Sequence, residues 1–250
     1  VLIAPDVQPD TLRKMVCDAD ALIVRAQLPD DIFDKQQRLR GAVRHGAGVD
    51  MIPIEAATAH GVLVANVPGV NAQAVAEHCM CGMLLLARST QRIDHALRHA
   101  DWSTSRKFTD DAIELSGRTV GIVGVGNVGR RLAEICHAGL RMRVLGHQRR
   151  LDALPNFVTG AALDTLFSES DFIVLSCPLT AATRGLITRA LIERMKPDSS
   201  LINVSRGPVV DEVALVDALR ERRIRGAALD VYTKQPLARD HPLLEFDNVI

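Results

Sequence analysis

Three closely spaced glycines constrain the fold of this chain more than any other feature. Gly124, Gly126 and Gly129 directly follow the apolar run 119–123, and an amphipathic segment with helical spacing follows at 131–140. The first glycine permits a tight turn after a strand, the second lets a ligand come close to the backbone, and the third lets the helix pack against the strand. In this context the spacing predicts the strand, turn and helix that open a doubly wound parallel α/β domain.

The rest of the chain repeats this order of elements, which predicts two such domains. Short aliphatic runs alternate with amphipathic segments, and continuous apolar runs are typical of buried parallel strands. In the first half we expect strands at 2–4, 21–24, 42–44 and 62–64, with helices at 9–19, 29–40 and 53–60. In the second half we expect strands at 119–123, 143–147, 172–176, 200–204 and 226–231, with helices at 127–139, 163–169, 188–195 and 211–222.

The boundary between the domains is expected after a long apolar helix. Residues 71–92 carry apolar side chains at helical spacing, and the more polar stretch 94–116, with the only tryptophan, is expected to be the crossover. We therefore predict a flavodoxin-like domain at 1–92 and a Rossmann dinucleotide-binding domain at 93–250, with ligands in their shared cleft. The apolar face of 71–92 is a candidate dimer interface, with core packing as the alternative.

Composition and charge exclude several other classes of protein. Thirty Lys and Arg balance thirty Asp and Glu, so no basic excess indicates a nucleic-acid partner. No apolar run reaches the roughly 20 residues of a membrane-spanning helix. Five cysteines are an odd number in a chain long enough to bury a core without disulfides, which favours a reducing cytoplasm. The chain begins and ends within apolar runs, so we expect it to be part of a longer protein.

The glycine turn also predicts a ligand. A helix that begins at such a turn presents free N–H groups and the positive end of its dipole, which favours the pyrophosphate of a dinucleotide. The residues expected to contact that group are Gly124, Gly126, Asn127, Val128 and Gly129. A glycine-rich turn without a ligand is the alternative.

The end of the next strand bears on the choice between NAD and NADP. NAD-selective sites place a carboxylate about 20 residues after the glycines. This chain instead has His147, Gln148, Arg149 and Arg150. No carboxylate repels a 2′-phosphate there, and Arg can bind phosphate with two hydrogen bonds. We expect NADP or NAD with NADP favoured; the alternative is that the arginines are solvated loop charges.

Four further motifs follow one another along the chain. They are Gly46–Asp50, Asn66–Asn71 with Ala76–Glu77, Asn203–Gly207, and Ala228–Tyr232 with Gln235–Pro236. Together with the glycine turn they resemble the D-isomer-specific 2-hydroxyacid dehydrogenases, a family that includes phosphoglycerate, glycerate, hydroxypyruvate and D-lactate dehydrogenases. The resemblance implies hydride transfer between NAD(P)H and a small 2-keto acid or D-2-hydroxy acid, such as glyoxylate or hydroxypyruvate, and a homodimer built through the nucleotide domain.

The resemblance implies that Arg206 is the catalytic cation and that it also contacts the cofactor. Reduction of a 2-keto acid needs positive charge at the carboxylate and carbonyl oxygens, and Arg binds such oxygens with two hydrogen bonds. Arg206 follows the predicted strand 200–204, and open parallel sheets bind ligands at that end of their strands. A structural ion pair with Asp211 or Glu212 is the alternative.

In the first half, the resemblance implies a site for the substrate carboxylate. The small residues Ala47, Gly48 and Val49 can present consecutive backbone N–H groups, which bind anions. An ordinary turn between a strand and a helix is the alternative. The resemblance also places Asn71 in the segment that lines the cleft.

Further residues of the second half are implied to contact the cofactor. The resemblance assigns Asp230 to the nicotinamide carboxamide, and it places Cys177 and Pro178 beside the nicotinamide ribose. Val204 and Ser205 complete this set. We interpret Cys177 as a small apolar wall and not as a nucleophile, because nothing adjacent would lower its pKa.

Two features depart from the family pattern. The family's acid/base is a His paired with a Glu, and the chain ends at Ile250, shortly before the place where that His is expected. Gln235 stands at the position of the Glu. An amide offers only a hydrogen bond, so we expect the His to have a lower pKa than in relatives with Glu, and a more acidic optimum for reduction. Gln at this position also resembles the formate dehydrogenase branch of the family. The cleft motifs of that branch are not seen in this sequence.

Two other functions would also use parts of this sequence. A dinucleotide-sensing corepressor-like protein would keep the glycine turn without catalysis, and a hydrolase similar to adenosylhomocysteinase would need a larger substrate domain. His78 could reach the cleft, His45 precedes the carboxylate loop, and His241 is expected to be a loop residue. No His or Cys spacing resembles a zinc site, so no metal is expected.

Overall fold

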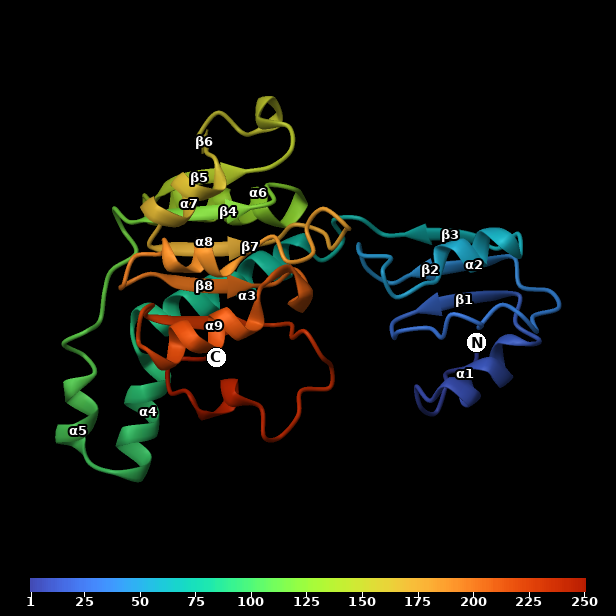
Figure 1. The fold of residues 1–250 in the computed structure, drawn as a ribbon, viewed down its shortest axis with the longest axis horizontal. Helices are drawn as coiled ribbons and strands as arrows, with labels where there is room; N and C mark the ends of the chain where they lie inside the picture. The colour runs from blue at the N-terminus through green and yellow to red at the C-terminus, as the bar shows by residue number, and fades with distance from the viewer. The chain divides into compact units, whose positions relative to one another are not determined.

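The computed structural model describes residues 1–250, which form two compact units at 1–71 and 72–250. Each unit contains one parallel sheet with helices packed on it (Figure 1). The predicted α/β class with parallel sheets is therefore confirmed. The division falls at Asn71, so the apolar helix that begins at Ala72 belongs to the second unit, whereas a boundary at 92 would place it in the first. No helix is long and apolar enough to cross a membrane.

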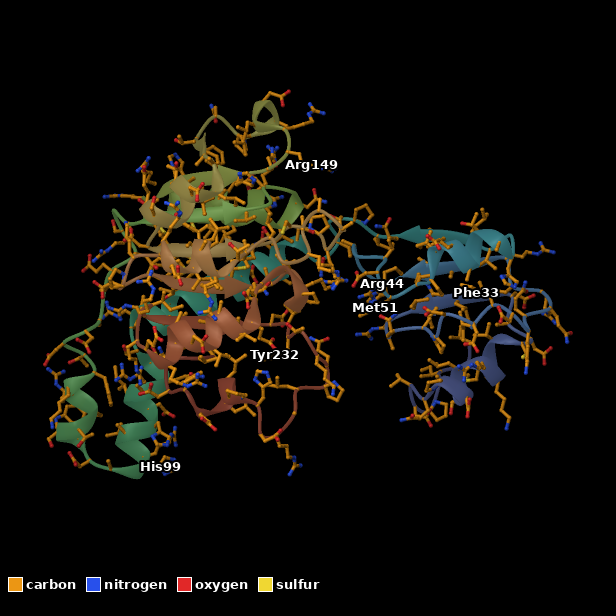
Figure 2. The ribbon with its side chains drawn as sticks, in the orientation of Figure 1. Phe33, Arg44, Met51, His99, Arg149 and Tyr232 are labelled. Atoms are coloured by element: carbon orange, nitrogen blue, oxygen red, sulfur yellow. The ribbon has the colours of Figure 1, made fainter.

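The first unit is a small three-stranded sheet. Its elements are α1 (Pro9–Val16), β1 (Ala21–Val24), β2 (Gly41–Arg44), α2 (Ile54–Ala59) and β3 (Leu63–Asn66). The strands pair in the order β1-β2-β3, all parallel. Buried apolar side chains on one side of the sheet, with Phe33 fully buried among them (Figure 2), form the core of this unit.

Two predictions for the first unit are wrong. Residues 2–4 do not form a strand, and Leu2 and Ile3 are exposed, because no neighbouring strand accepts or donates their backbone hydrogen bonds. The segment 29–40 forms turns and not a helix. Its local backbone bonds join residues three apart, as from Asp34 N–H to the carbonyl of Asp31, and the side chains of Ile32 and Phe33 in these turns are buried.

The second unit is a larger doubly wound domain. Its helices are α3 (Ala72–Ala87), α4 (Thr90–His99), α5 (Trp102–Lys107), α6 (Asn127–Glu134), continued by a π-helix at Ile135–Gly139, α7 (Leu163–Glu169), α8 (Arg189–Glu193) and α9 (Glu212–Arg220). Its strands are β4 (Thr119–Val123), β5 (Arg143–His147), β6 (Val158–Gly160), β7 (Phe172–Leu175), β8 (Ser200–Asn203) and β9 (Gly226–Leu229). Single 3₁₀ turns occur at Leu151–Ala153, Gly207–Val209 and Pro242–Glu245.

The six parallel strands of the second unit have the order β6-β5-β4-β7-β8-β9. The order reverses between β4 and β7, which is the topological switch point where such sheets bind ligands. Strands β4, β7 and β8 are fully buried, because one apolar cluster with α3 and α6 covers one face and another with α7, α8 and α9 covers the other. Burial on both faces explains why these strands are mainly apolar in sequence.

The region predicted as one long helix and a polar crossover has a different structure. Helix α3 ends at Ala87, and α4 begins at Thr90 after Ser89, whose φ of 51° interrupts the helical hydrogen bonds. Two helices, α4 and α5, occupy most of the predicted crossover. The apolar face of α3 contributes Cys79 and Met83 to the core of the second unit, so core packing accounts for that face.

Candidate functional site

The carboxyl ends of five strands bring the predicted residues of the second unit to one edge of the sheet. Gly124 follows β4, Gln148 follows β5, Cys177 comes after β7, Val204 follows β8 and Asp230 follows β9. All five strands are parallel, so their carboxyl ends lie at the same edge. Residues distant in sequence thereby surround the switch point between β4 and β7.

The glycine turn has the geometry of a phosphate-binding turn. Gly124 has a φ of +96°, and a Cβ there would lie 2.6 Å from the backbone nitrogen of Cys177. A Cβ at Gly129 would overlap the carbonyl oxygen of Gly124. Gly126, in contrast, has nothing within 4 Å of its Cβ position. The outer glycines are therefore needed for packing, and the middle one borders open space.

Free N–H groups surround that open space. The N–H groups of Asn127, Val128 and Gly129 have no acceptor in the structure, as expected for the first turn of a helix. The carbonyl of Gly124 accepts a hydrogen bond of 2.7 Å from Ser176 Oγ, so this acceptor is already engaged. Donors without competing acceptors fit the pyrophosphate of a dinucleotide.

The end of β5 offers one unpaired cation and no carboxylate. His147 Nδ1 lies 3.0 Å from the carbonyl of Ala161, and Gln148 Nε2 donates to the carbonyl of Arg150 over 2.7 Å. Arg150 pairs with Asp152 at 3.5 Å. Arg149 is exposed on the loop after β5 and has no partner (Figure 2). Arg149 is thus the side chain available for an additional phosphate.

Arg206 lies in a turn that a buried asparagine shapes. Asn203 is 2% exposed, accepts from the Ser205 N–H at 3.0 Å and donates to the Arg206 carbonyl at 3.2 Å. The guanidinium of the half-buried Arg206 donates to the Ser205 carbonyl at 2.7 Å. Asp211 accepts from the N–H of Ala214 and so caps α9. This carboxylate caps α9, and the Arg206 turn lies after β8 at the sheet edge.

Asp230 and Cys177 border the same edge. The N–H of Asp230 donates to the carbonyl of Asn203 at 3.0 Å, and His78 Nε2 of α3 lies 3.9 Å from Asp230 Oδ1. Burial raises the pKa of the Cys177 thiol, so the thiol is protonated at neutral pH. Pro178 follows it, and its carbonyl accepts from Thr183 Oγ1 at 2.6 Å.

Gln235 lies in an exposed loop that follows Asp230. The side chain has no hydrogen-bond partner in the structure. No cluster of three or more His, Cys, Asp or Glu side chains with the geometry of a metal site occurs in residues 1–250.

The predicted carboxylate loop of the first unit combines free donors with occupied acceptors. Ala47, Gly48 and Val49 have N–H groups without acceptors. The carbonyl of Ala47 accepts from Asn66 Nδ2 at 2.7 Å, and that of Gly48 accepts from Arg44 Nε at 3.1 Å. Because the carbonyls are held by other groups, the donors of this loop can face an anion. Asn71, at the end of this unit, is exposed.

Sequence reasoning did not single out two arginines of the first unit. Arg44 ends β2 (Figure 2), and besides Gly48 its guanidinium donates to the carbonyls of Val24 and His45. Arg25 follows β1, is exposed and has no partner. Both lie at the carboxyl ends of parallel strands. A cation directly after an apolar strand is the signal that could have identified them.

Comparisons with known proteins agree with this geometry. Residues 80–250 match the family model described as "D-isomer specific 2-hydroxyacid dehydrogenase, NAD binding domain". D-3-phosphoglycerate dehydrogenase of Archaeoglobus fulgidus is 39% identical over 236 residues, which cover 92% of this chain and 44% of that protein. Glyoxylate reductase of Aeropyrum pernix is 38% identical over 250 residues, which cover 96% of this chain and 74% of that protein.

Solved structures are similar over nearly the whole chain. An acyclic imino acid reductase in complex with NADPH and D-Arg has a TM-score of 0.87 at 28% identity, covering 98% of this chain and 78% of that one. An NAD-dependent formate dehydrogenase from Staphylococcus aureus in complex with NAD has a TM-score of 0.85 at 30% identity, covering 96% and 73%. The chain spans slightly less than half the length of the phosphoglycerate dehydrogenases of Archaeoglobus fulgidus and Methanocaldococcus jannaschii, at 44% and 48%.

Proposed function

The chain belongs to the D-isomer-specific 2-hydroxyacid dehydrogenase family, and we propose that it takes part in hydride transfer between NAD(P)H and a small 2-keto acid or D-2-hydroxy acid. One observation carries this proposal. A single sheet edge combines the glycine turn and its free N–H groups with the cationic turn at Arg206. A dinucleotide and an anionic substrate need those two features side by side.

The residues around the glycine turn fit the cofactor. NAD(P)H, when bound, supplies the hydride. The free N–H groups of Asn127, Val128 and Gly129 would bind its pyrophosphate, and Asp230 would accept a hydrogen bond from its carboxamide. The buried, protonated Cys177 would form an apolar wall that excludes water from the reacting face.

Arg206 and the loop at 47–49 would hold the substrate. The guanidinium of Arg206 would bind the carboxylate or carbonyl oxygen and stabilise the negative charge that develops as the carbonyl is reduced. The N–H groups of Ala47, Gly48 and Val49 would bind the substrate carboxylate, and Asn71 would line its site. Gln235 would orient the proton donor through a hydrogen bond, without the charge that a Glu contributes.

We also propose that NADPH is preferred to NADH. The support is the absence of a carboxylate at 147–150 and the unpaired guanidinium of Arg149. A carboxylate would repel the 2′-phosphate, whereas Arg attracts it.

Four further expectations remain proposals. They are a substrate domain at 1–92 with a nucleotide domain at 93–250, a homodimer, a cytoplasmic location, and no nucleic-acid partner. The balanced charge of the chain supports the last of these.

The function is tested by absorbance of the nicotinamide during turnover by the full-length protein. NADPH and NADH are compared against glyoxylate, hydroxypyruvate, pyruvate and phosphohydroxypyruvate. We expect consumption of NADPH with at least one of these acids, and loss of turnover with retained NADPH binding in Arg206→Ala. Binding of both cofactors without consumption of either would refute the proposal and favour a dinucleotide sensor.

A further inference from the structure

The loop that carries Gln235 has few contacts of its own. Residues 233–236 and 238–240 are exposed. Within 234–240 the structure contains one hydrogen bond, which the carbonyl of Ala238 accepts from the N–H of His241. A loop held so weakly samples many conformations unless its ends are fixed. The position of Gln235 therefore depends on the anchors at Thr233 and His241.

One carboxylate holds both ends of this loop. Glu212 Oε2 accepts from the N–H of Thr233 at 3.0 Å, and Glu212 Oε1 lies 3.4 Å from His241 Nε2. The side chains of Glu212 and His241 are 24% and 21% exposed, so this contact is partly shielded from water, whereas the hydrogen bond to Thr233 is exposed. We call these three residues the Glu212 clamp.

The other ring nitrogen of His241, Nδ1, determines which nitrogen of the ring carries the proton. Nδ1 accepts a hydrogen bond of 3.3 Å from the N–H of Leu243, whose side chain is 2% exposed in the core. An acceptor nitrogen carries no proton, so the proton of the neutral ring lies on Nε2, the nitrogen 3.4 Å from Glu212 Oε1. The His241 end of the clamp is thus connected to the apolar core through Leu243.

The near end of the loop packs on the turn of Arg206. A Cβ at Gly207 would overlap the backbone of Tyr232 and Thr233. Tyr232 is partly buried and packs against the same core cluster as Leu243 (Figure 2). The clamp therefore joins the Arg206 turn and the Gln235 loop through the first residue of α9.

We propose that Glu212 and His241 are positioning residues. By closing residues 233–241 on the start of α9, the clamp holds Gln235 in a constant place relative to the Arg206 turn. This inference rests on the proposed function for its catalytic consequence, whereas the closure of the loop is testable without turnover.

The experiment compares the full-length parent with Glu212→Ala, His241→Ala and the double variant. Controls are Glu221→Ala, at the other end of α9, and His99→Ala, an exposed histidine on α4 (Figure 2). Three quantities are measured: kcat with NADPH at saturating keto acid, Kd for NADPH, and the initial rate of tryptic cleavage within the loop. The loop contains two trypsin sites, after Lys234 and after Arg239.

We expect each clamp variant to lower kcat and to accelerate loop cleavage by about tenfold, the effect of losing one contact of the Glu212 carboxylate. The Kd for NADPH should change less than about twofold, because the glycine turn is untouched. The double variant should resemble the stronger single one, since either change opens the same clamp. Glu212→Gln keeps an oxygen for the Thr233 N–H and should recover part of kcat.

Several results would overturn the inference. One is loop cleavage at the parental rate in Glu212→Ala and His241→Ala. Another is faster cleavage with parental kcat, and a third is a parallel loss of kcat, NADPH affinity and melting temperature, which would indicate general unfolding. If the parent consumes no cofactor, the proposed function fails; cleavage then decides the clamp, supported by acceleration and overturned by parental rates.

Discussion

Substitution of the middle glycine of the turn should separate cofactor binding from stability. Gly126 has an ordinary negative φ of −81°, and nothing lies within 4 Å of its Cβ position. Gly126 is the N-cap residue of α6, where glycine is preferred to alanine, whereas alanine restricts the unfolded chain more than glycine does. Because these two effects oppose each other, Gly126→Ala should change the free energy of unfolding by less than about 1 kcal/mol, which for a chain of this size is a change in Tm of no more than about 4 °C.

The same methyl group should weaken cofactor binding. The open space next to Gly126 is where the pyrophosphate would approach the free N–H groups of Asn127 and Val128. An added methyl group in a well-packed interface costs about 1 to 3 kcal/mol. The Kd for NADPH should thus increase about 5- to 150-fold.

The assay pairs thermal unfolding without cofactor with fluorescence titration of NADPH. Gly139→Ala is a matched control, because this glycine is also exposed with nothing within 4 Å of its Cβ position. It should change neither Kd nor activity. Gly124→Ala should instead lower Tm, because its φ is +96° and its Cβ would lie 2.6 Å from the Cys177 nitrogen. Parental NADPH affinity in Gly126→Ala would refute the assignment of this turn.

Three further predictions concern other parts of the second unit. Arg149→Ala should lower kcat/KM about tenfold with NADPH and less than about twofold with NADH, and Arg150→Ala, which removes a residue already paired with Asp152, should change neither as strongly. Asn203→Ala leaves the buried N–H of Ser205 without its acceptor, so it should lower the free energy of unfolding by about 1 to 3 kcal/mol and also lower kcat/KM. Thermal unfolding and steady-state kinetics check these two effects. A loss of stability with parental kcat/KM would contradict the role of Asn203 in shaping the Arg206 turn. Burial raises the pKa of Cys79 and Cys136 to about 12 from an ordinary value of 9.0. Their stabilising contribution is therefore complete below pH 9 and is lost as pH rises toward 12, because the unfolded thiols ionise first. In urea unfolding at pH 8 and pH 10.5, the free energy of unfolding should decrease less between these pH values in a Cys79→Ala, Cys136→Ala variant than in the parent.

Local signals in the sequence predict most of the second unit. The strands at 119–123 and 143–147 and the helix at 163–169 have the predicted bounds. Strands buried on both faces consist mainly of apolar residues, so runs of these residues mark their positions in the sequence. Strand β6 was not predicted, because its three residues are too few for a periodic pattern.

The errors occur where an element depends on partners elsewhere in the chain. Residues 2–4 have the composition of a strand but no neighbouring strand. The apolar pattern of 71–92 continues through Ser89, whose left-handed backbone divides it into two helices. His241, expected to be an ordinary loop residue, pairs with Glu212, which lies 29 positions earlier in the sequence. No local pattern indicates such contacts.

The sequence by itself determined the α/β class, the glycine turn with its dinucleotide chemistry, and the types of residue that we propose to bind an anionic substrate. These follow from short-range properties: the spacing of glycines, the length of apolar runs, and the charge that follows a strand. Only the tertiary structure decided three features of the site. The carbonyls of Ala47 and Gly48 are occupied while the N–H groups of 47–49 are free, Asn203 shapes the Arg206 turn, and Glu212 contacts both ends of the Gln235 loop. Each of these depends on hydrogen bonds between groups brought together by strand order and packing, because the sequence specifies which donors and acceptors exist and the fold specifies which of them meet.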